Sequence, residues 1–320
     1  MIRDSSSAAA TAVIGIDFGG TKIEAALAAR DGAVLRRERL EMLADRGPGQ
    51  ALERTAEAVG RLEQVAHAEY GLEVGGYAAV APGVIQPDRI LLTPNLPGWQ
   101  ELALSRQLAR VLGLDQPPAV MNDVHAGALA ELRHGALRGT DPGLYVSLGT
   151  GVAAAVTVGG RVLSGAHQAA GEIGYADPGP VSGRELVAGP AVLEELVGGK
   201  GLGERAAALL GTELTAAQLF ERTDAASLEL VNSSLEMLAR TIAGFCTLLD
   251  PEAVVVGGGM MASADLILPA LRARLEQSVP FPPEVRAAHF TENASLHGAL
   301  FLALDRLPSS GRPSDLHAAV

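Results

Sequence analysis

The sequence predicts an α/β protein of two domains, and three observations carry this prediction. The chain has 320 residues, 48% of them hydrophobic, which is enough for two domains with separate cores. Short apolar runs of strand type alternate with longer runs of helical period. A meander of three strand-like runs occurs twice, each time followed by mixed helices and strands. This repetition indicates a duplicated architecture with a cleft between its halves.

The elements follow in order from their hydrophobic periodicity. The first half is expected to contain strands at about 12–18, 23–29, 33–41, 76–81 and 118–121, and helices near 48–70 and 103–112 and from about 124. The second half is expected to contain strands at about 144–148, 152–158, 161–164 and 253–256, and helices near 187–197, 202–210, 215–221, 226–249, 263–277 and 293–306. Gly159-Gly160 predicts a two-residue hairpin turn. The polar ends, residues 1–11 and 308–320, are expected to be disordered.

Composition excludes several classes of protein. The net charge is −12 and the chain has no Lys/Arg-rich block, which argues against a nucleic-acid partner. No run reaches the roughly 18 apolar residues of a membrane span, and the first residues lack the apolar core of a secretory signal. We therefore expect a cytoplasmic protein without a membrane partner. The single Cys246 is expected to be an inert core thiol.

A turn near the start of the chain favours phosphate binding. Asp17 ends an apolar run, and Gly19 and Gly20 follow with Thr21 and Lys22 at the tip. The glycines are expected to adopt positive φ and to bring backbone N–H groups close to an anion, while Thr21 and Lys22 add a hydroxyl and a cation. The chain has only two lysines, so a lysine at the tip of this turn is unexpected by chance. An ordinary hairpin turn is the alternative.

Two further glycine clusters follow apolar strands. Gly149-Thr150-Gly151 is a second candidate phosphate loop, and Gly257-Gly258-Gly259 would let a flat ligand approach the backbone. Together with Glu172, the second loop also fits a loose dinucleotide fingerprint. That fingerprint needs a helix directly after the glycines, whereas a strand and a hairpin follow here, so a dehydrogenase is disfavoured. For the third cluster, a helix-capping loop is the alternative. No P-loop motif occurs in the chain.

A strand delivers Asn122 and Asp123 to the start of a helix. A carboxylate at such a junction can serve as a general base, and the alternative is that Asp123 caps the helix. We expect the neighbouring His125 to be an ordinary, partly exposed helix residue.

The order and spacing of these motifs resemble the ROK (repressor, open reading frame, kinase) family of sugar kinases over about residues 12–305. The motifs are Asp17–Lys22, Pro94–Trp99, Asn122-Asp123, Gly149–Gly151, Gly171–Gly174, Gly189-Pro190 and Gly257–Gly259. The resemblance implies a two-domain hexokinase/actin-like (ribonuclease H-like) fold with a central cleft. It implies a smaller domain at 12–124, on which a C-terminal helix at about 293–306 packs, and a larger domain at 125–292.

The resemblance also implies roles for single residues. ATP phosphates and Mg²⁺ would face Asp17, Gly19, Gly20, Thr21 and Lys22, with the metal near Asp17. Gly149, Thr150 and Gly151 would form the second phosphate loop, and Gly257, Gly258 and Gly259 would lie by the adenosine. Sugar hydroxyls would be held by Asn95, Asn122, Asp123 and Glu172. Asp123 would accept the proton of the attacking hydroxyl, which fits the needs of phosphoryl transfer.

The chain departs from the family pattern after Gly174. Many members place a sugar-touching histidine there and supply three cysteines for zinc, whereas this chain has Tyr175 and no cysteine in the segment. We therefore expect no structural zinc, and we expect Tyr175 to reshape the sugar pocket. Glu185 is shifted by one position from the usual acid, with Arg184 in that slot. Such a shift turns a helical side chain by about 100°, so a sugar contact from Glu185 is left open.

The expected activity is ATP-dependent phosphorylation of the primary 6-hydroxyl of a hexose, with glucose as the default acceptor. Amino-hexoses, N-acylated hexosamines and sugar-like cyclitols are alternatives, and polyphosphate in place of ATP is left open. A sugar-responsive repressor is a remote alternative, because such members carry an N-terminal helix-turn-helix and few residues precede the first strand here. A catalytically dead sugar-binding module is disfavoured, because Asp123 and both loops are present. A homodimer is expected from the family.

Overall fold

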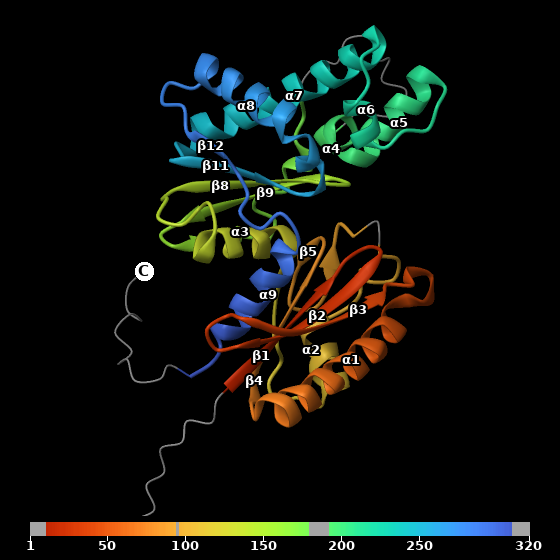
Figure 1. Ribbon diagram of the computed structural model, residues 1–320, viewed down its shortest axis with the longest axis vertical. Coiled ribbons are helices and arrows are strands. Elements are labelled where there is room, and N and C mark those ends of the chain that lie inside the picture. Colours follow the sequence, from red (N-terminus) through yellow and green to blue (C-terminus); the bar gives the residue numbers. More distant parts are fainter. Residues whose placement is uncertain (1–10, 94–95, 179–191, 309–320) are drawn as a thin grey trace, which may run out of the picture. The chain divides into compact units, whose positions relative to one another are not determined.

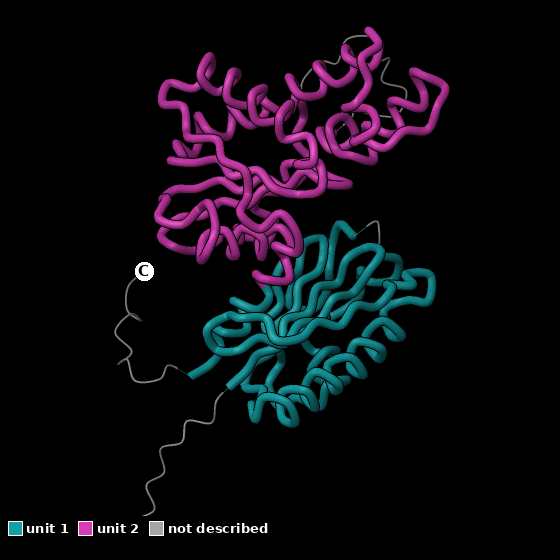
Figure 2. The backbone as a smooth tube through the Cα atoms, in the orientation of Figure 1, with its two compact units in different colours: residues 1–121, 299–320 teal, residues 122–298 magenta. Residues whose placement is uncertain are grey.

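The computed structural model of the protein describes residues 11–93, 96–178 and 192–308. Contacts between Cα atoms divide the chain into two compact units (Figure 2), one formed by residues 1–121 with 299–320 and the other by residues 122–298. Several predictions fall outside the described residues: those for both terminal tails, for Asn95, and for Arg184, Glu185 and Gly189-Pro190.

A five-stranded sheet forms the base of the first unit. Its strands are β1 (Thr11–Phe18), β2 (Lys22–Ala29), β3 (Val34–Glu41), β4 (Glu73–Ala81) and β7 (Ala119–Asn122). They lie in the order β3-β2-β1-β4-β7, and Figure 1 labels β1, β2, β3 and β4 of this sheet. β2 is antiparallel to both β1 and β3, whereas β4 is parallel to β1. A two-stranded ribbon of β5 (Val84–Ile85) and β6 (Ile90–Leu91) follows β4.

Helices cover both faces of this sheet. α1 (Gly47–Tyr70), which follows the short 3-10 helix η1 (Ala44–Arg46), and α2 (Leu104–Leu112) share one apolar core with alternate residues of β1, such as Ile14 and Ile16. The other face meets the second half of α9 (Ala294–Leu304). A Cβ atom on Gly15 would lie 2.9 Å from the backbone nitrogen of Leu300, so this glycine permits α9 to approach the strand closely.

The second unit repeats the sheet of the first. Its strands are β8 (Gly143–Leu148), β9 (Val152–Val158), β10 (Arg161–Val162), β11 (Ala253–Gly257) and β12 (Glu284–Ala287). Their order is β10-β9-β8-β11-β12, with an antiparallel meander and two parallel strands. In both sheets the first three strands form an antiparallel meander, and the fourth and fifth strands extend the sheet beyond the first strand. This shared order confirms the predicted duplication.

The helices of the second unit also lie on both faces of its sheet. α3 (Asp123–His134) packs on the face that carries Tyr145 and Val255, while α7 (Ala225–Leu249) and α8 (Ala264–Ser278) pack on the face of Val146 and Val254. The remaining elements are α4 (Leu193–Val197), α5 (Gly199–Leu210), α6 (Ala216–Phe220) and the short 3-10 helices η2 (Ile173–Tyr175) and η3 (Gly259–Ser263).

Most predicted elements are confirmed to within a few residues, and the differences are local. The helix expected from 202 begins at Gly199. Of the helix expected over 187–197, residues 187–191 lie outside the described ranges, and the structure has α4 in the remainder. The predictions lack β12 and the β5/β6 ribbon, because these strands have only four and two residues, too few to show a hydrophobic period. Gly159 and Gly160 have φ of 59° and 71°, so the predicted two-residue turn is confirmed.

Two further predictions concern the helices: the state of Cys246 and the absence of a membrane-spanning segment. Cys246 is buried in α7, and burial raises the pKa of its thiol to about 12, which keeps the thiol protonated and inert. Within the described ranges, no helix has the length and apolar character that crossing a bilayer demands.

Candidate active site

In the first unit, the turn between β1 and β2 is a tight hairpin. The N–H of Gly19 donates to the carbonyl of Lys22 at 2.9 Å, and the N–H of Met42 donates to the carbonyl of Thr21 at 2.9 Å. The prediction of positive φ is wrong for Gly19. The glycine is needed there for space instead, because a Cβ atom would lie 3.1 Å from the carbonyl oxygen of Lys22.

Three charged side chains lie near this turn. Asp17 is directly opposite Glu24 in the strand register, and Lys22 forms an ion pair with Glu24. Asp17 is half-buried and Glu24 is buried. Mg²⁺ in kinases is held by one or two carboxylates together with substrate phosphates and water, so the carboxylate of Asp17 is a suitable donor for the predicted metal.

In the second unit, the turn between β8 and β9 contacts α5. The N–H of Gly199 donates to the carbonyl of Gly149 at 2.9 Å, and the N–H of Lys200 donates to the carbonyl of Thr150 at 3.0 Å. The first turn of α5 therefore fixes the predicted second phosphate loop through its backbone.

Glu194 of α4 holds the other end of this loop. Its carboxylate accepts the N–H of Val152 at 3.1 Å, and a Cβ atom on Gly151 would lie 2.0 Å from the same oxygen. A larger residue at position 151 would displace this carboxylate from its place beside the loop. The sequence predictions did not include Glu194, because its helix position gives no sign of a contact with a loop 42 residues earlier.

The third glycine cluster ends β11 with a close backbone contact. Gly258 has φ of 93°, and a Cβ atom there would lie 2.3 Å from the carbonyl oxygen of Leu148. Gly257 packs against the hydroxyl of Tyr145, whereas a Cβ atom on Gly259 would meet nothing within 4 Å. Gly258 is also the residue that precedes η3, so the helix-capping alternative describes part of its role.

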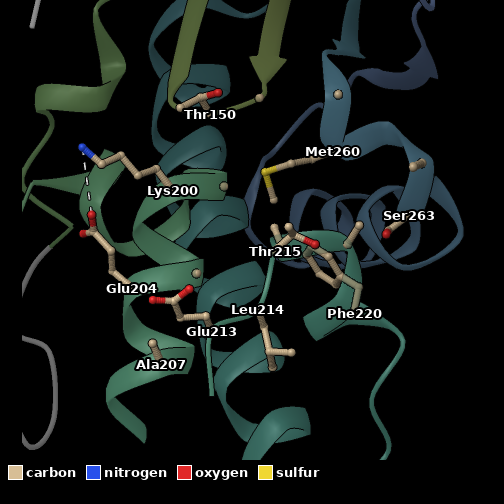
Figure 3. A pocket seen from close by; sticks show the side chains of 17 residues that line it. Thr150, Lys200, Glu204, Ala207, Glu213, Leu214, Thr215, Phe220, Met260 and Ser263 are labelled. Atoms are coloured by element: carbon tan, nitrogen blue, oxygen red, sulfur yellow. Dashed lines mark ion pairs between the residues drawn. The ribbon is translucent and has the colours of Figure 1, made fainter. Parts of the chain in front are cut away.

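A cavity of about 600 Å³ opens beside the second loop (Figure 3). Its walls come from the loop, η3, α5, α6 and the chain between α5 and α6. Of the predicted residues, Gly149, Thr150 and Gly259 line it. The predictions missed the other fourteen lining residues, which are Gly199, Lys200, Gly203, Glu204, Ala207, Glu213, Leu214, Thr215, Ala216, Ala217, Phe220, Met260, Ala262 and Ser263. Because lysine is rare in this chain, the sequence could have indicated Lys200 as a candidate site residue. The apolar lining residues have no sequence feature that distinguishes them from core residues.

The junction of β7 and α3 holds the candidate base. The side-chain oxygen of Asn122 accepts the N–H groups of Val124 at 2.8 Å and His125 at 3.0 Å, so Asn122 caps the helix. The alternative in which Asp123 is the cap is therefore wrong. The carboxylate of Asp123 accepts the N–H of Val124 at 2.9 Å.

The electrostatics around Asp123 suit general-base chemistry. Burial, and secondly the nearby charge of Glu172, raise the pKa of Asp123 to about 6. Burial and the charge of Glu194 raise the pKa of Glu172 in turn. A carboxyl group with a pKa near neutrality is ionised at physiological pH and still basic enough to accept a proton in a transition state.

His125 differs from its prediction. It is buried, with 6% of its surface exposed, and its Nε2 lies 2.7 Å from the carbonyl oxygen of Ala170. Burial lowers the pKa of the imidazole, so the neutral ring donates its proton to this carbonyl. His125 thereby joins the start of α3 to the turn that precedes Glu172. Helical periodicity could not reveal a partner 45 residues away.

Tyr175 ends the short helix that begins directly after Glu172. Its backbone N–H donates to the carbonyl of Glu172 at 3.2 Å, and 53% of its surface is exposed. Partial burial and the charge of Glu172 raise the pKa of its phenol, so the hydroxyl stays protonated.

No metal-binding group of three or more His, Cys, Asp or Glu side chains is found in residues 11–93, 96–178 and 192–308. Part of the segment compared with the family's zinc motif, residues 179–191, lies outside these ranges. The absence of zinc accordingly stays a prediction.

Comparisons with known proteins define the class and then the family. A ROK hexokinase from Thermus thermophilus superimposes with a TM-score of 0.75 at 30% identity, covering 91% of this chain and 97% of that one. The fold is therefore that of the hexokinase/actin-like sugar kinases, as predicted. Residues 13–306 match the ROK family. The chain belongs to the ROK family.

Two relatives with assigned names extend over nearly the whole chain. An N-acetylmannosamine kinase of Shigella boydii is 32% identical over 91% of this chain and 97% of its own length. A glucokinase of Thermotoga maritima is 26% identical over 92% of this chain and 98% of its own. Both relatives are sugar kinases, and so is this protein.

Proposed function

We propose that the protein transfers the γ-phosphoryl group of ATP to the 6-hydroxyl of a hexose, and that an N-acylated hexosamine such as N-acetylmannosamine is its first candidate acceptor. Glucose is the second candidate. The observation that carries the proposal is the pair of Asp123 and Glu172, two carboxyl groups with raised pKa values in a chain related to N-acetylmannosamine kinases along its length. The higher identity to these kinases than to the glucokinase supports the order of the candidates.

Asp123 is the proposed general base. Its ionised carboxylate accepts the proton of the sugar hydroxyl as the hydroxyl oxygen attacks the γ-phosphorus and the bond to the β-phosphate oxygen breaks. Glu172, Asn122 and Asn95 are proposed to hold other hydroxyl groups of the sugar. A buried sugar hydroxyl left without a partner costs about 1–3 kcal/mol, so short polar side chains around it give selectivity.

The cavity beside the second loop is proposed to bind the nucleoside of ATP. Its volume of about 600 Å³ and its apolar residues, such as Leu214, Phe220 and Met260, suit a purine ring. The loops at 19–22 and 149–151 are proposed to contact phosphates. When bound, Mg²⁺ near Asp17 would neutralise charge on the phosphates.

A coupled assay of ADP release tests this proposal. The wild-type protein would be assayed with ATP and Mg²⁺ against N-acetylmannosamine, N-acetylglucosamine, glucose, glucosamine, mannose and a cyclitol, with Asp123→Asn as the matched inactive control. We expect the highest kcat/KM on an N-acylated hexosamine and measurable turnover of glucose. Turnover of no sugar would contradict the kinase proposal, whereas a clear preference for glucose would contradict only the order of acceptors. Inorganic polyphosphate in place of ATP forms a separate arm, in which we expect no product.

A further inference from the structure

The charges that line the cavity of Figure 3 are unevenly distributed. Lys200 is the only cation among the described residues that line it, and Glu204 and Glu213 are its acids. Lysine is rare in this chain, which has 25 Lys and Arg residues in total but only two lysines. The other lining residues are neutral or acidic, so a single cation in this wall raises the question of which anion it contacts.

The backbone of Lys200 is fixed next to the second loop. Its N–H donates to the carbonyl of Thr150 at 3.0 Å, and the preceding N–H, of Gly199, donates to the carbonyl of Gly149 at 2.9 Å. These two N–H groups are therefore already used within the protein. The ammonium group of Lys200 remains as the charged donor that this part of the wall can offer to a phosphate group.

The partner of Lys200 in the structure holds it only weakly. The Nζ atom lies 4.0 Å from a carboxylate oxygen of Glu204, and the two side chains are 66% and 69% exposed. An exposed pair at this distance contributes little to stability, because water screens it and both long side chains lose freedom. A phosphate group, with more charge and several acceptor oxygens, is a stronger partner for the ammonium group.

In Figure 3, Lys200 and Thr150 lie toward one end of the cavity, and Leu214 and Phe220 lie further from the loop. A nucleotide with its ring against the apolar residues would thus direct its phosphates toward Thr150. We propose that Lys200 is a nucleotide-binding residue whose ammonium group leaves Glu204 to contact a phosphate group of the bound nucleotide. This inference rests on the proposed function, which places the nucleoside in this cavity.

Calorimetric binding of ATP, ADP, AMP and adenosine tests the inference. We expect Lys200→Met to raise the Kd for ATP and ADP about 10-fold or more and to change the Kd for adenosine less than about twofold. Lys200→Arg is expected to retain ATP affinity within about threefold, because it keeps the charge. Glu204→Gln, the matched control, is expected to lower the Kd for ATP modestly without affecting adenosine, because it removes the competing carboxylate.

Two results would overturn the inference. An equal loss of affinity for ATP and adenosine in Lys200→Met would assign Lys200 a purely structural role, and an unchanged Kd for ATP would remove it from the site. Failure of the proposed function has a different signature: the wild-type protein would then bind none of the four ligands. The thermal melting of each variant without ligand shows that the fold is intact.

Discussion

Asp123 is the residue on which the proposed chemistry depends most. If it accepts the proton of the sugar hydroxyl, Asp123→Asn should lower kcat by at least about 10²-fold, the usual effect of losing a positioned base. The substitution keeps the shape of the side chain, so sugar binding and melting temperature should be largely retained. Steady-state kinetics and calorimetry with the best sugar check this prediction. A variant with near wild-type turnover would show that Asp123 is not the base.

The raised pKa of Asp123 predicts a pH dependence. Because the ionised form is needed, kcat/KM should fall as the pH decreases through about 6. Glu172→Gln removes a charge that raises this pKa, so the acidic limb should move to lower pH in that variant.

The same raised pKa affects the stability of the fold in the opposite direction: activity increases as Asp123 ionises, whereas stability decreases. A carboxyl pKa raised from 3.8 stabilises the fold below pH about 4, and this contribution is lost as the pH rises through 6.

Tyr175 is predicted to affect the choice of sugar more than the chemical step. It follows Glu172 closely and is half-exposed, and its phenol is larger than the imidazole that many family members have there. Tyr175→His should change the ratio of kcat/KM between glucose and an amino-hexose by about 10-fold or more, while turnover of the best sugar survives. Tyr175→Phe separates the role of the hydroxyl from that of the ring. An unchanged ratio in both variants would exclude a role in specificity.

At the scale of elements, the glycines that end β11 offer a matched pair of variants. Gly258 combines positive φ with a Cβ position 2.3 Å from the backbone of β8, whereas Gly259 has open space. Gly258→Ala should destabilise the protein by more than about 2 kcal/mol, because backbone atoms must shift. Gly259→Ala should leave the melting temperature unchanged and raise the KM for ATP if the nucleotide lies there. Equal melting temperatures of the two variants would contradict the steric argument.

Elements also show where prediction from sequence succeeds. The runs at 12–18 and 152–158 are so strongly apolar that the sequence predicts two buried strands, and both are confirmed, one in each five-stranded sheet. The alternative in which Asp123 caps α3 is wrong, and sequence could not exclude it, because Asn122 and Asp123 are both good caps and only the backbone conformation decides between them. The buried position of His125 depends on the turn at Ala170, which belongs to another part of the chain.

At the scale of the whole molecule, we predict that the purified protein contains no stoichiometric zinc. The chain has one cysteine, in α7, so it cannot supply the three thiolates found in many family members. Elemental analysis should therefore find much less than one zinc per chain. A zinc chelator should leave the melting temperature unchanged, because no folding energy comes from the metal. About one zinc per chain would show that other residues replace the cysteines.

The sequence by itself determined the duplicated α/β fold, the family and the candidate base Asp123, because hydrophobic period and glycine spacing are local properties of the chain. Only the tertiary structure decided which residues surround these motifs. Glu194 beside Gly151 and Lys200 beside Thr150 come from helices more than forty residues later. The pKa of Asp123 is likewise a tertiary property, since it depends on burial and on Glu172. Such contacts arise when distant segments pack together, and no local pattern encodes them.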